Sequence, residues 1–520
     1  MSRAGTILRN VASNWAGFAV NAAVTLALTP FVLRHLGPAG YGIWVLSASI
    51  IGYYGLLDLG FRAGVTQHLT RYLAAGDEVK ASECMSSAVA ALAALGVVLV
   101  ALSIGAAFFA PTVFHLSPDM EREAFWCILI VGCSSAVQFA LQPFTSVFTA
   151  LQRFDLANLI GVGTRLLTAA SIVLALNMGY GLIGVSAATC ATSVIDYLIR
   201  WHIARRLTPH LEVSWRKASL PRLREIGSFG AWNFLISVNT YVYQYVPNLL
   251  IAAFMPIAAV GYYALATGLS RQINSMLSSI GQVIYPAAVG LHVQGSRRDL
   301  ERLYLDGSRL TLLTMIPVVL VSLIWAEDFY RLWIGASYLD AAPFGSVALV
   351  FQILLIGITT NFSNIAAQVL MGSGRISLVA GALICGSILA FALTRILISY
   401  YGIVGVAVAT VLASVVVDLI AMPLLVQRVL GFRLGTYFRR ACVRPLAAMV
   451  LQACLIICIR LTREPGSWIQ LILQGLLVGV GSVVIAIFIG ITASERQRFA
   501  VEPIRRLWRR AERMLQTPGA

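Results

Sequence analysis

Charge is scarce in this 520-residue chain. Charged residues account for 12% of the positions, whereas hydrophobic residues account for 59%. A soluble globular protein carries roughly 25% charged residues, so this chain cannot cover a water-exposed surface with charge. The mean hydropathy of +0.82 points the same way. The composition therefore excludes an ordinary soluble fold and indicates a protein whose surroundings are lipid.

Lysine is nearly absent, although the net charge is +16. The lysines are Lys80 and Lys217, and neither stands in a G-x-x-x-x-G-K-[ST] sequence, which excludes a P-loop nucleotide site. The arginines lie between apolar runs rather than in a separate basic domain. That distribution fits orientation signals and contacts with anionic lipid head groups. We therefore expect membrane lipids as partners, with no nucleotide and no nucleic acid.

Reactive and metal-binding patterns are also missing. The eight cysteines include no C-x-x-C pair and mostly fall in apolar runs, as expected of small packing residues. The six histidines are scattered, and no loop is long enough for a soluble catalytic domain. We expect no metal, no cofactor and no enzyme activity. A membrane-embedded glycan polymerase or ligase is the alternative from another class, and it would need a reactive cluster at a membrane face.

Long apolar runs recur along the whole chain. A membrane-spanning helix needs about 20 apolar residues, whereas barrel strands are short and alternating, so the runs predict helices. We expect an all-α integral membrane protein with about fourteen transmembrane helices. The segments are 11–33, 41–61, 84–110, 124–150, 157–177, 181–203, 228–253, 258–289, 308–326, 344–370, 377–399, 402–426, 442–460 and 468–492.

The distribution of arginine predicts the orientation. With a cytoplasmic N-terminus, the outer loops hold only Arg34, Arg122, Arg331, Arg460 and Arg463, and the many other loop arginines face the cytoplasm. This is a clear positive-inside pattern in an inner (cytoplasmic) membrane, with both termini cytoplasmic. Residues 494–520 form an Arg-rich amphipathic pattern, which predicts a helix on the cytoplasmic leaflet. A tail that docks a partner is the alternative.

The sequence contains an internal repeat. GLIGVSAAT from Gly181 matches GIVGVAVAT from Gly402, and PAGYGIW from Pro38 has a looser counterpart in PIAAVGYY from Pro256. The copies are about 220 residues apart, or six helices, and an even number places both on the same side of the membrane. We therefore expect two pseudo-symmetric six-helix lobes around a central cavity. The divisions are an N-terminal lobe (1–205), a linker (206–227), a C-terminal lobe (228–428), helices 13 and 14 (440–493) and the tail (494–520).

Ionisable side chains inside apolar segments are costly and usually face a cavity or a partner. Asp58 and Arg62 are four residues apart and can pair on one helix face, and Arg271 lies near the middle of its segment. The planar guanidinium binds phosphate well, so we predict that Arg62 and Arg271 bind an anionic substrate in the cavity. Asp58 is predicted as an ion-pair or coupling residue. Alternatively, Arg62 is a topology charge and Arg271 a snorkelling or inter-helix arginine.

Neutral polar side chains gather on the first and seventh segments and on the eighth, where two lobes would face each other. These residues would recognise the sugar part of a substrate through hydrogen bonds and aromatic contacts. The candidates are Asn14, Asn21, Asn233, Asn239, Tyr243 and Asn274. Four further ionisable residues, to which we assign no site, are Arg165, Asp196, Arg395 and Asp418.

Two stretches near the N-terminus carry a family resemblance. RHLGPAGYGIW (34–44) followed by YYGLLDLGF (53–61) resembles the polysaccharide transporters, the Wzx-type O-antigen and exopolysaccharide flippases of the multidrug/oligosaccharidyl-lipid/polysaccharide superfamily. The helix number, the paired lobes and the extra C-terminal pair extend the likeness over essentially the whole chain.

The resemblance implies export of an undecaprenyl-pyrophosphate-linked oligosaccharide by alternating access. It further implies that Arg62 and Arg271 attract the pyrophosphate, that a proton or sodium gradient drives the cycle, and that other polysaccharide-assembly membrane proteins are partners. A multidrug or lipid II exporter of the same superfamily is the alternative. A drug exporter would need acidic residues deep in a lobe, whereas these cavity helices carry a net positive charge.

Overall fold

The computed structural model describes residues 3–58, 61–282, 284–341, 344–462 and 464–490. Within those ranges it leaves aside the side chains of residues 3–16, 228–233, 235, 279–282, 340, 341 and 462. The predicted amphipathic tail (494–520) lies outside the described residues. In this part of the chain the strands are a two-residue antiparallel pair, β1 (Asp340–Ala341) and β2 (Gly345–Ser346), and nearly everything else is helical.

The described chain contains ten helical segments that are long and apolar enough to cross a membrane. Two of them, Gly17–Asp58 and Ile376–Leu430, have 42 and 55 residues, and about 20 residues suffice for one crossing. Each is therefore long enough for two crossings. The predicted all-α, multi-pass membrane protein is confirmed, and the number of fourteen helices stays a prediction.

Glycines set the breaks inside the longest helices. α1 (Arg3–Gly52) changes direction at Gly37, where φ is 69°, and α15 (Ile376–Val415) does so at Gly402, where φ is 56°. Glycine adopts positive φ without the steric cost that a side chain brings. Gly181, which begins α7, has a φ of 52°. The first residues of the two repeat copies therefore both have a positive φ of similar size.

By internal packing the chain divides into two units, residues 1–265 with 383–409 (unit 1) and residues 266–382 with 410–520 (unit 2). The first unit begins with α1 and ends within α9, and it includes the central part of α15. Its other elements are η1 (Tyr53–Asp58), α2 (Phe61–Ala74), α3 (Glu78–Val113), α4 (Pro118–Leu141), η2 (Gln142–Phe144), α5 (Thr145–Ala150), α6 (Phe154–Asn177), α7 (Gly181–Leu207), η3 (Trp215–Lys217), α8 (Leu220–Phe254) and α9 (Ile257–Gln282).

Unit 2 contains the part of α9 that begins at Ala266 and the chain from α10 onward, except for the central part of α15. Its elements are α10 (Ile284–Val293), α11 (Arg297–Ile324), α12 (Ala326–Trp333), η4 (Ala336–Tyr338), β1, β2, α13 (Val347–Thr359), η5 (Thr360–Ser363), α14 (Asn364–Gly372), parts of α15, η6 (Val416–Ala421), α16 (Met422–Leu430), α17 (Leu434–Tyr437), η7 (Phe438–Cys442), α18 (Val443–Thr462), α19 (Trp468–Ile485) and η8 (Ala486–Gly490).

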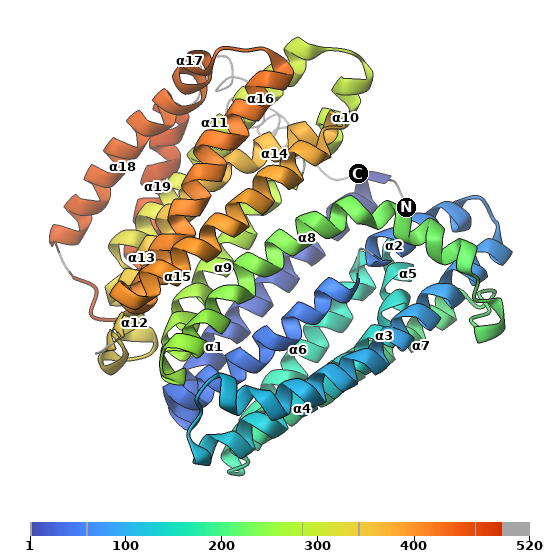
Figure 1. Cartoon of the computed structure of the whole chain (residues 1–520). Coiled ribbons are helices and arrows are strands. Elements are labelled where there is room, and N and C mark those ends of the chain that lie inside the picture. The colour runs from blue at the N-terminus through green and yellow to red at the C-terminus, as the bar shows by residue number, and fades with distance from the viewer. Residues whose placement is uncertain (1–2, 59–60, 283, 342–343, 463, 491–520) are drawn as a thin grey trace, which may run out of the picture. The chain divides into compact units, whose positions relative to one another are not determined.

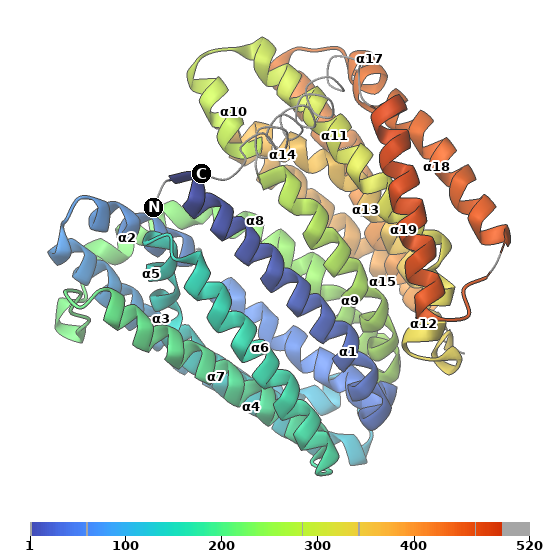
Figure 2. The ribbon, with the colours of Figure 1, turned by 180° about the vertical axis from the view of Figure 1, so that it is seen from behind.

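Within unit 1, α3 packs along α4, α6 along α7, and α1 against α6 (Figures 1 and 2). An apolar core joins α2, α3, α5 and α8 and includes Leu69, Met85, Phe148 and Ile226. The loose repeat copies also meet here. A Cβ on Gly42 would lie 2.3 Å from the carbonyl oxygen of Ile257, and one on Gly261 would lie 2.3 Å from that of Pro38. The close crossing of α1 and α9 therefore requires glycine at both positions.

Within unit 2, α11 is the helix around which the others pack. It contacts α13, α14 and α18, and α19 lies beside α18. Trp325, Ile456 and Val478 form a buried apolar cluster between α11, α18 and α19. The opposite side of α19 leaves Leu473, Leu476 and other large apolar residues exposed, as expected of a helix whose solvent is lipid.

Candidate substrate pocket in unit 1

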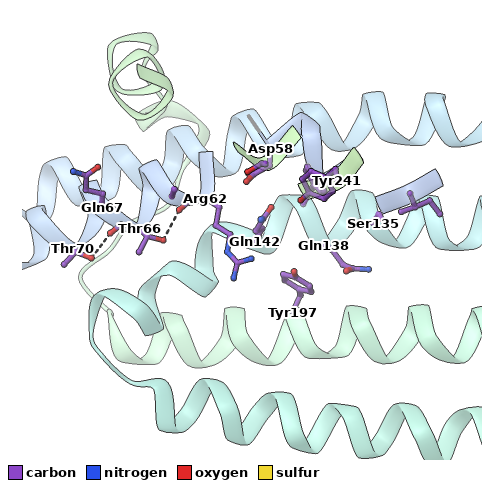
Figure 3. A pocket seen from close by; sticks show the side chains of 15 residues that line it. Asp58, Arg62, Thr66, Gln67, Thr70, Ser135, Gln138, Gln142, Tyr197 and Tyr241 are labelled. Atoms are coloured by element: carbon purple, nitrogen blue, oxygen red, sulfur yellow. Dashed lines mark hydrogen bonds between the residues drawn. The ribbon is translucent and has the colours of Figure 1, made fainter. Parts of the chain in front are cut away.

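A pocket of about 850 Å³ opens in unit 1 between η1, α2, α4, α7 and α8 (Figure 3). Most of the side chains that line it are polar. They are Ile51, Gly55, Asp58, Arg62, Ala63, Thr66, Gln67, Thr70, Ser135, Gln138, Phe139, Gln142, Tyr197, Ser237 and Tyr241. Of the sequence-predicted site residues, the pocket brings Asp58 and Arg62 together.

One wall of the pocket is a polar stripe on α2. Positions 62, 66 and 70 are one helical turn apart, so their side chains share a face. The Thr66 hydroxyl donates to the carbonyl oxygen of Arg62 at 2.9 Å, and that of Thr70 donates to the carbonyl of Thr66 at 2.6 Å. These threonines bond largely to their own helix, which leaves the pocket open beside Arg62.

Arg62 is the basic residue of the lining. Its side chain is exposed, and it extends toward Tyr197 and Gln142 (Figure 3). Its guanidinium makes no hydrogen bond or ion pair with another described side chain, although its charge acts on Asp58 and Tyr197. A guanidinium held this way can bind an incoming phosphate oxygen through its planar fork of N–H donors.

Asp58 lies at the end of η1, four positions before Arg62. Its Oδ1 atom is buried and has no hydrogen-bond partner within the described part of the chain. The backbone N–H and the positive charge of Arg62 both act on the carboxylate. The pocket therefore contains one acid and one base, and the base is the group that points into the open space.

α4 and η2 supply a second polar wall that the sequence analysis missed. Ser135, Gln138 and Gln142 are spaced three and four residues apart, which places them on one helix face. The Oε1 atom of Gln142 is buried and has no protein partner among the described residues. Amide groups donate and accept at once, as sugar hydroxyls require. The three-and-four spacing inside an apolar segment was the signal in the sequence.

From α8, Ser237 and Tyr241 form the third wall, and Tyr241 belongs to a group of aromatic side chains. Tyr241 stacks on Tyr245 with ring centroids 5.9 Å apart, and Tyr245 lies 5.8 Å from Tyr53 of η1. The buried Asn248 donates from Nδ2 to the Ser49 hydroxyl at 2.9 Å and fixes α8 against α1. An aromatic face with a hydroxyl at its edge offers both apolar contact and hydrogen bonding to a ligand.

The far end of α2 is held by a charged cluster on α2, α3 and α8. Arg222 donates to Glu83 at 3.0 Å and to Glu225 at 2.7 Å, and Tyr72 donates to Glu225 at 2.8 Å. The His68 Nδ1 atom lies 3.4 Å from the same Glu225 carboxylate. The hydrogen bond from Arg222 holds the pKa of Glu225 below its ordinary value. This cluster, outside the pocket, fixes the helix that presents Arg62.

The linker before α8 is attached to α3 by serines. Ser214 and Glu212 donate their backbone N–H groups to the hydroxyls of Ser86 and Ser82, at 3.1 and 3.2 Å. Ser219 does the same to Ser87 at 3.0 Å. All three acceptor serines are buried. The part of the predicted linker (206–227) that lies between α7 and α8, residues 208–219, is thus attached along α3.

Other predicted residues lie away from this pocket. Asn239 on α8 accepts from the Ser387 hydroxyl at 2.6 Å, Tyr243 is half-buried, and Asn21 lies half-buried on α1. The side chains of Asn14 and Asn233 lie outside the described residues. These positions are not lining residues of the unit 1 pocket.

Arg271 and Asn274 belong to the part of α9 in unit 2. The Asn274 Oδ1 atom accepts from the Ser278 hydroxyl at 3.2 Å and from the Asn361 amide. Arg271 is exposed and has no hydrogen bond or ion pair to the described side chains. Since the two units are described separately, a shared role for Arg62 and Arg271 stays a prediction.

Comparison with known proteins agrees with this architecture. The family model "Polysaccharide biosynthesis protein" matches residues 7–292. The uncharacterized membrane protein EpsK of Bacillus subtilis is 22% identical over 498 residues, which cover 94% of this chain and 96% of that protein. A candidate O-antigen transporter of Shigella flexneri is 18% identical over 408 residues, which cover 78% and 94%.

Solved structures share the fold at low sequence identity. The inward closed lipid II flippase MurJ has a TM-score of 0.66 at 15% identity, covering 91% of this chain and 98% of that one. An inward-facing multidrug resistance transporter of the MATE family and the MOP superfamily also has a TM-score of 0.66, at 13% identity, covering 80% and 98%. With a family model matching more than half its length, the chain belongs to the polysaccharide biosynthesis protein family.

Proposed function

We propose that this protein is a flippase that moves an oligosaccharide linked to undecaprenyl pyrophosphate from the cytoplasmic to the periplasmic leaflet of the bacterial inner membrane. Transport proceeds by alternating access, with both termini in the cytoplasm. The observation that carries the proposal is Arg62, whose guanidinium has no hydrogen bond or ion pair to the described side chains and lies in a pocket whose other walls are mainly amide, hydroxyl and tyrosine side chains.

The chemistry of the pocket matches the two ends of such a substrate head group. Arg62 suits the pyrophosphate, because guanidinium and phosphate oxygens form strong, charge-assisted hydrogen bonds. Gln138, Gln142 and Tyr241 suit sugar hydroxyls and sugar ring faces. The volume of about 850 Å³ is at the upper end of small-molecule pockets, roughly 300–1,000 Å³, and accommodates several sugar rings.

A multidrug exporter is less well supported. An exporter of cationic drugs needs unpaired acidic groups, whereas the acid of this pocket, Asp58, lies beside Arg62. A lipid II exporter shares the pyrophosphate chemistry, and the identity of the accumulated glycan distinguishes it. A polymerase or ligase would act on glycan that has already crossed the membrane, and the location of the accumulated glycan distinguishes it.

The test is a deletion strain in which lipid-linked glycan is extracted and assigned to a leaflet. The strain is complemented with wild type, Arg62→Ala, Arg271→Ala or Arg206→Ala. Arg206 is an exposed arginine of α7 outside the pocket lining and serves as the matched control. All variants are checked for normal insertion and amount.

We expect undecaprenyl-linked oligosaccharide to accumulate on the cytoplasmic leaflet in the deletion strain. Wild type and Arg206→Ala should restore export, and Arg62→Ala should not. Equal rescue by Arg62→Ala would overturn the role of this pocket. Accumulation of lipid II would favour the lipid II exporter. Unpolymerised glycan in the periplasm would favour the polymerase or ligase.

A further inference from the structure

Each repeat copy contains one carboxylate inside its last membrane helix, and the partners of this carboxylate differ between the two copies. Asp196 on α7 lies fifteen residues after Gly181, and Asp418 in η6 lies sixteen residues after Gly402. The second copy therefore has one extra residue before its acid. η6 (Val416–Ala421) is a π-helix, the local structure that absorbs a single extra residue in an α-helix. The π-helix restores the register from Asp418 onward.

In unit 1 the carboxylate is neutralised. Arg200, one turn after Asp196, forms an ion pair with its Oδ2 atom at 2.6 Å. Thr164 donates its hydroxyl to Oδ1 at 2.9 Å. Both charged side chains are mostly buried, with 17% and 16% of their surfaces exposed. A paired carboxylate of this kind is structural, because removing either partner leaves a buried charge uncompensated.

In unit 2 the neutralising arginine is replaced. The residue one turn after Asp418 is Met422, which is buried. The partner of Asp418 among the described residues is Thr360 of η5, whose hydroxyl donates to Oδ2 at 2.9 Å. Asp418 therefore keeps the hydroxyl donor that its counterpart has and lacks the cation.

The surroundings of Asp418 contain no compensating charge in the described part of unit 2. η6 packs against η5 and α16, and α13 and α14 lie next to these elements. η5, α13 and α14 contain no charged or titratable residue, and the charged residue of α16 is Arg428. Arg428 is exposed and ten residues away, or about 15 Å along the helix.

A proton is the ligand that this arrangement fits. An unpaired carboxylate in an apolar interior is costly, and taking up a proton removes the charge. One carboxylate and one hydroxyl are too few for a hard metal cation, since such ions take about six or more oxygen ligands. No group of acidic or histidine side chains suited to a metal is present among the described residues.

Polar groups connect this site with α9. Asn361 follows Thr360 on η5, and its amide donates to Asn274 on α9. Beside it, a cavity of about 10 Å³ is bordered by Ser278, Thr311 and Asn361, with room for about one water molecule. η5 thus contacts both Asp418 and the helix that carries Arg271.

We propose that Asp418 is the proton-binding carboxyl group that couples this transporter to the proton gradient. The Oδ1 atom takes up one proton while Thr360 keeps its hydrogen bond to Oδ2, so the side chain cycles between −1 and 0. Release of the proton restores the charged carboxylate. The coupling role rests on the proposed export function, whereas proton binding by Asp418 does not.

Infrared difference spectroscopy on the full-length protein in lipid nanodiscs tests the binding site without any substrate. A pH titration of wild type should show a carboxylic acid C=O stretching band from a group in apolar surroundings. Asp418→Asn should lose the band. Met422→Arg, which recreates the pair found at Asp196 and Arg200, should also lose it, because the new cation keeps Asp418 ionised. Met422→Leu is the matched control and should retain it.

Complementation of the deletion strain tests coupling. Asp418→Asn and Met422→Arg should lose glycan export, while Met422→Leu should keep it. An acid band that persists in Asp418→Asn would overturn the proton site. A band that disappears without loss of export would overturn the coupling role. If the deletion strain accumulates no lipid-linked glycan, the proposed function is wrong, and the infrared result still decides whether Asp418 binds a proton.

Discussion

On one face of α2, Arg62 extends into the pocket with no hydrogen-bond partner among the described side chains, whereas on the other face Tyr72 and His68 lie against Glu225. The two faces belong to a single helix of 14 residues. Buried polar groups stabilise a fold when they are satisfied, and a binding group must keep its hydrogen bonds for the ligand. The comparison shows how one helix serves both purposes. The face with Tyr72 and His68, here called the paired face, fixes the helix, and the opposite face, here called the pocket face, presents Arg62 to a ligand.

The largest effect is expected when Arg62 is removed from the pocket face of α2. Arg62→Ala should lower glycan export about ten- to a hundredfold, because a hydrogen bond to a charged group contributes about 1.5–3 kcal/mol and each 1.4 kcal/mol is a factor of about ten. The thermal unfolding of the purified protein, followed by tryptophan fluorescence, should stay within about 0.5 kcal/mol of wild type. A clear loss of thermal stability in Arg62→Ala would mean that this arginine belongs to the structural face.

The second largest effect is expected when the hydrogen bonds that hold the paired face of α2 are removed. Arg222→Ala removes the hydrogen bonds to Glu83 and Glu225 and should lower the free energy of unfolding by about 2 kcal/mol. Export should persist at temperatures well below the unfolding transition. Arg216→Ala, an exposed arginine of the same linker, is the control and should unfold like wild type. An Arg222→Ala protein that unfolds with the control would contradict the role of the cluster.

A smaller effect is expected from removing a single hydroxyl on the paired face of α2. Tyr72→Phe removes the hydroxyl that donates to Glu225 and accepts from Arg222, while the ring stays in the apolar core. The expected loss is about 1 kcal/mol, the typical net contribution of one hydrogen bond. Tyr400→Phe, on an exposed tyrosine, should change nothing. Thermal unfolding of both proteins in the same detergent measures the difference.

The smallest effect is a pH dependence of the paired face. Glu225 has a lowered pKa in the folded protein because Arg222 donates to it. Its contribution to stability is therefore complete above the ordinary glutamate pKa of 4.5 and is lost as the pH falls through the lowered value. Glu225→Gln should be less stable than wild type at neutral pH, and the gap should close on acidification. A gap that widens at low pH would contradict the assignment.

Much of the fold followed from local patterns. Long apolar runs predicted a helical membrane protein, and the glycines that begin the two repeat copies, Gly181 and Gly402, have similar φ values of 52° and 56°. Helix limits were less accurate. The second predicted segment (41–61) corresponds to the end of α1 and to η1, whereas the separate helix α2 (Phe61–Ala74) was not predicted, because its amphipathic sequence lacks the uninterrupted hydrophobicity that marks a membrane span.

The candidate site was predicted in part. Asp58 and Arg62 stood out because charge inside an apolar run is rare, and both line the pocket. Gln138 and Gln142 did not stand out, because neutral amides in an apolar helix give a weak signal. The amide oxygen of Asn239 accepts from Ser387, a contact between residues far apart in the sequence, and its predicted role in the cavity stays a prediction.

The sequence by itself determined that this protein lies in a membrane, that its halves repeat and which residues carry charge at membrane depth, because composition and spacing are local properties. Only the tertiary structure decided which side chains from other elements contact these charges. Arg200, which pairs with Asp196, follows it by one turn on the same helix and is absent from the second copy already in the sequence, whereas the hydroxyls that donate to the two acids come from other elements, Thr164 of α6 to Asp196 and Thr360 of η5 to Asp418. The cost of a buried charge depends on neighbours from other helices, and packing brings these neighbours together.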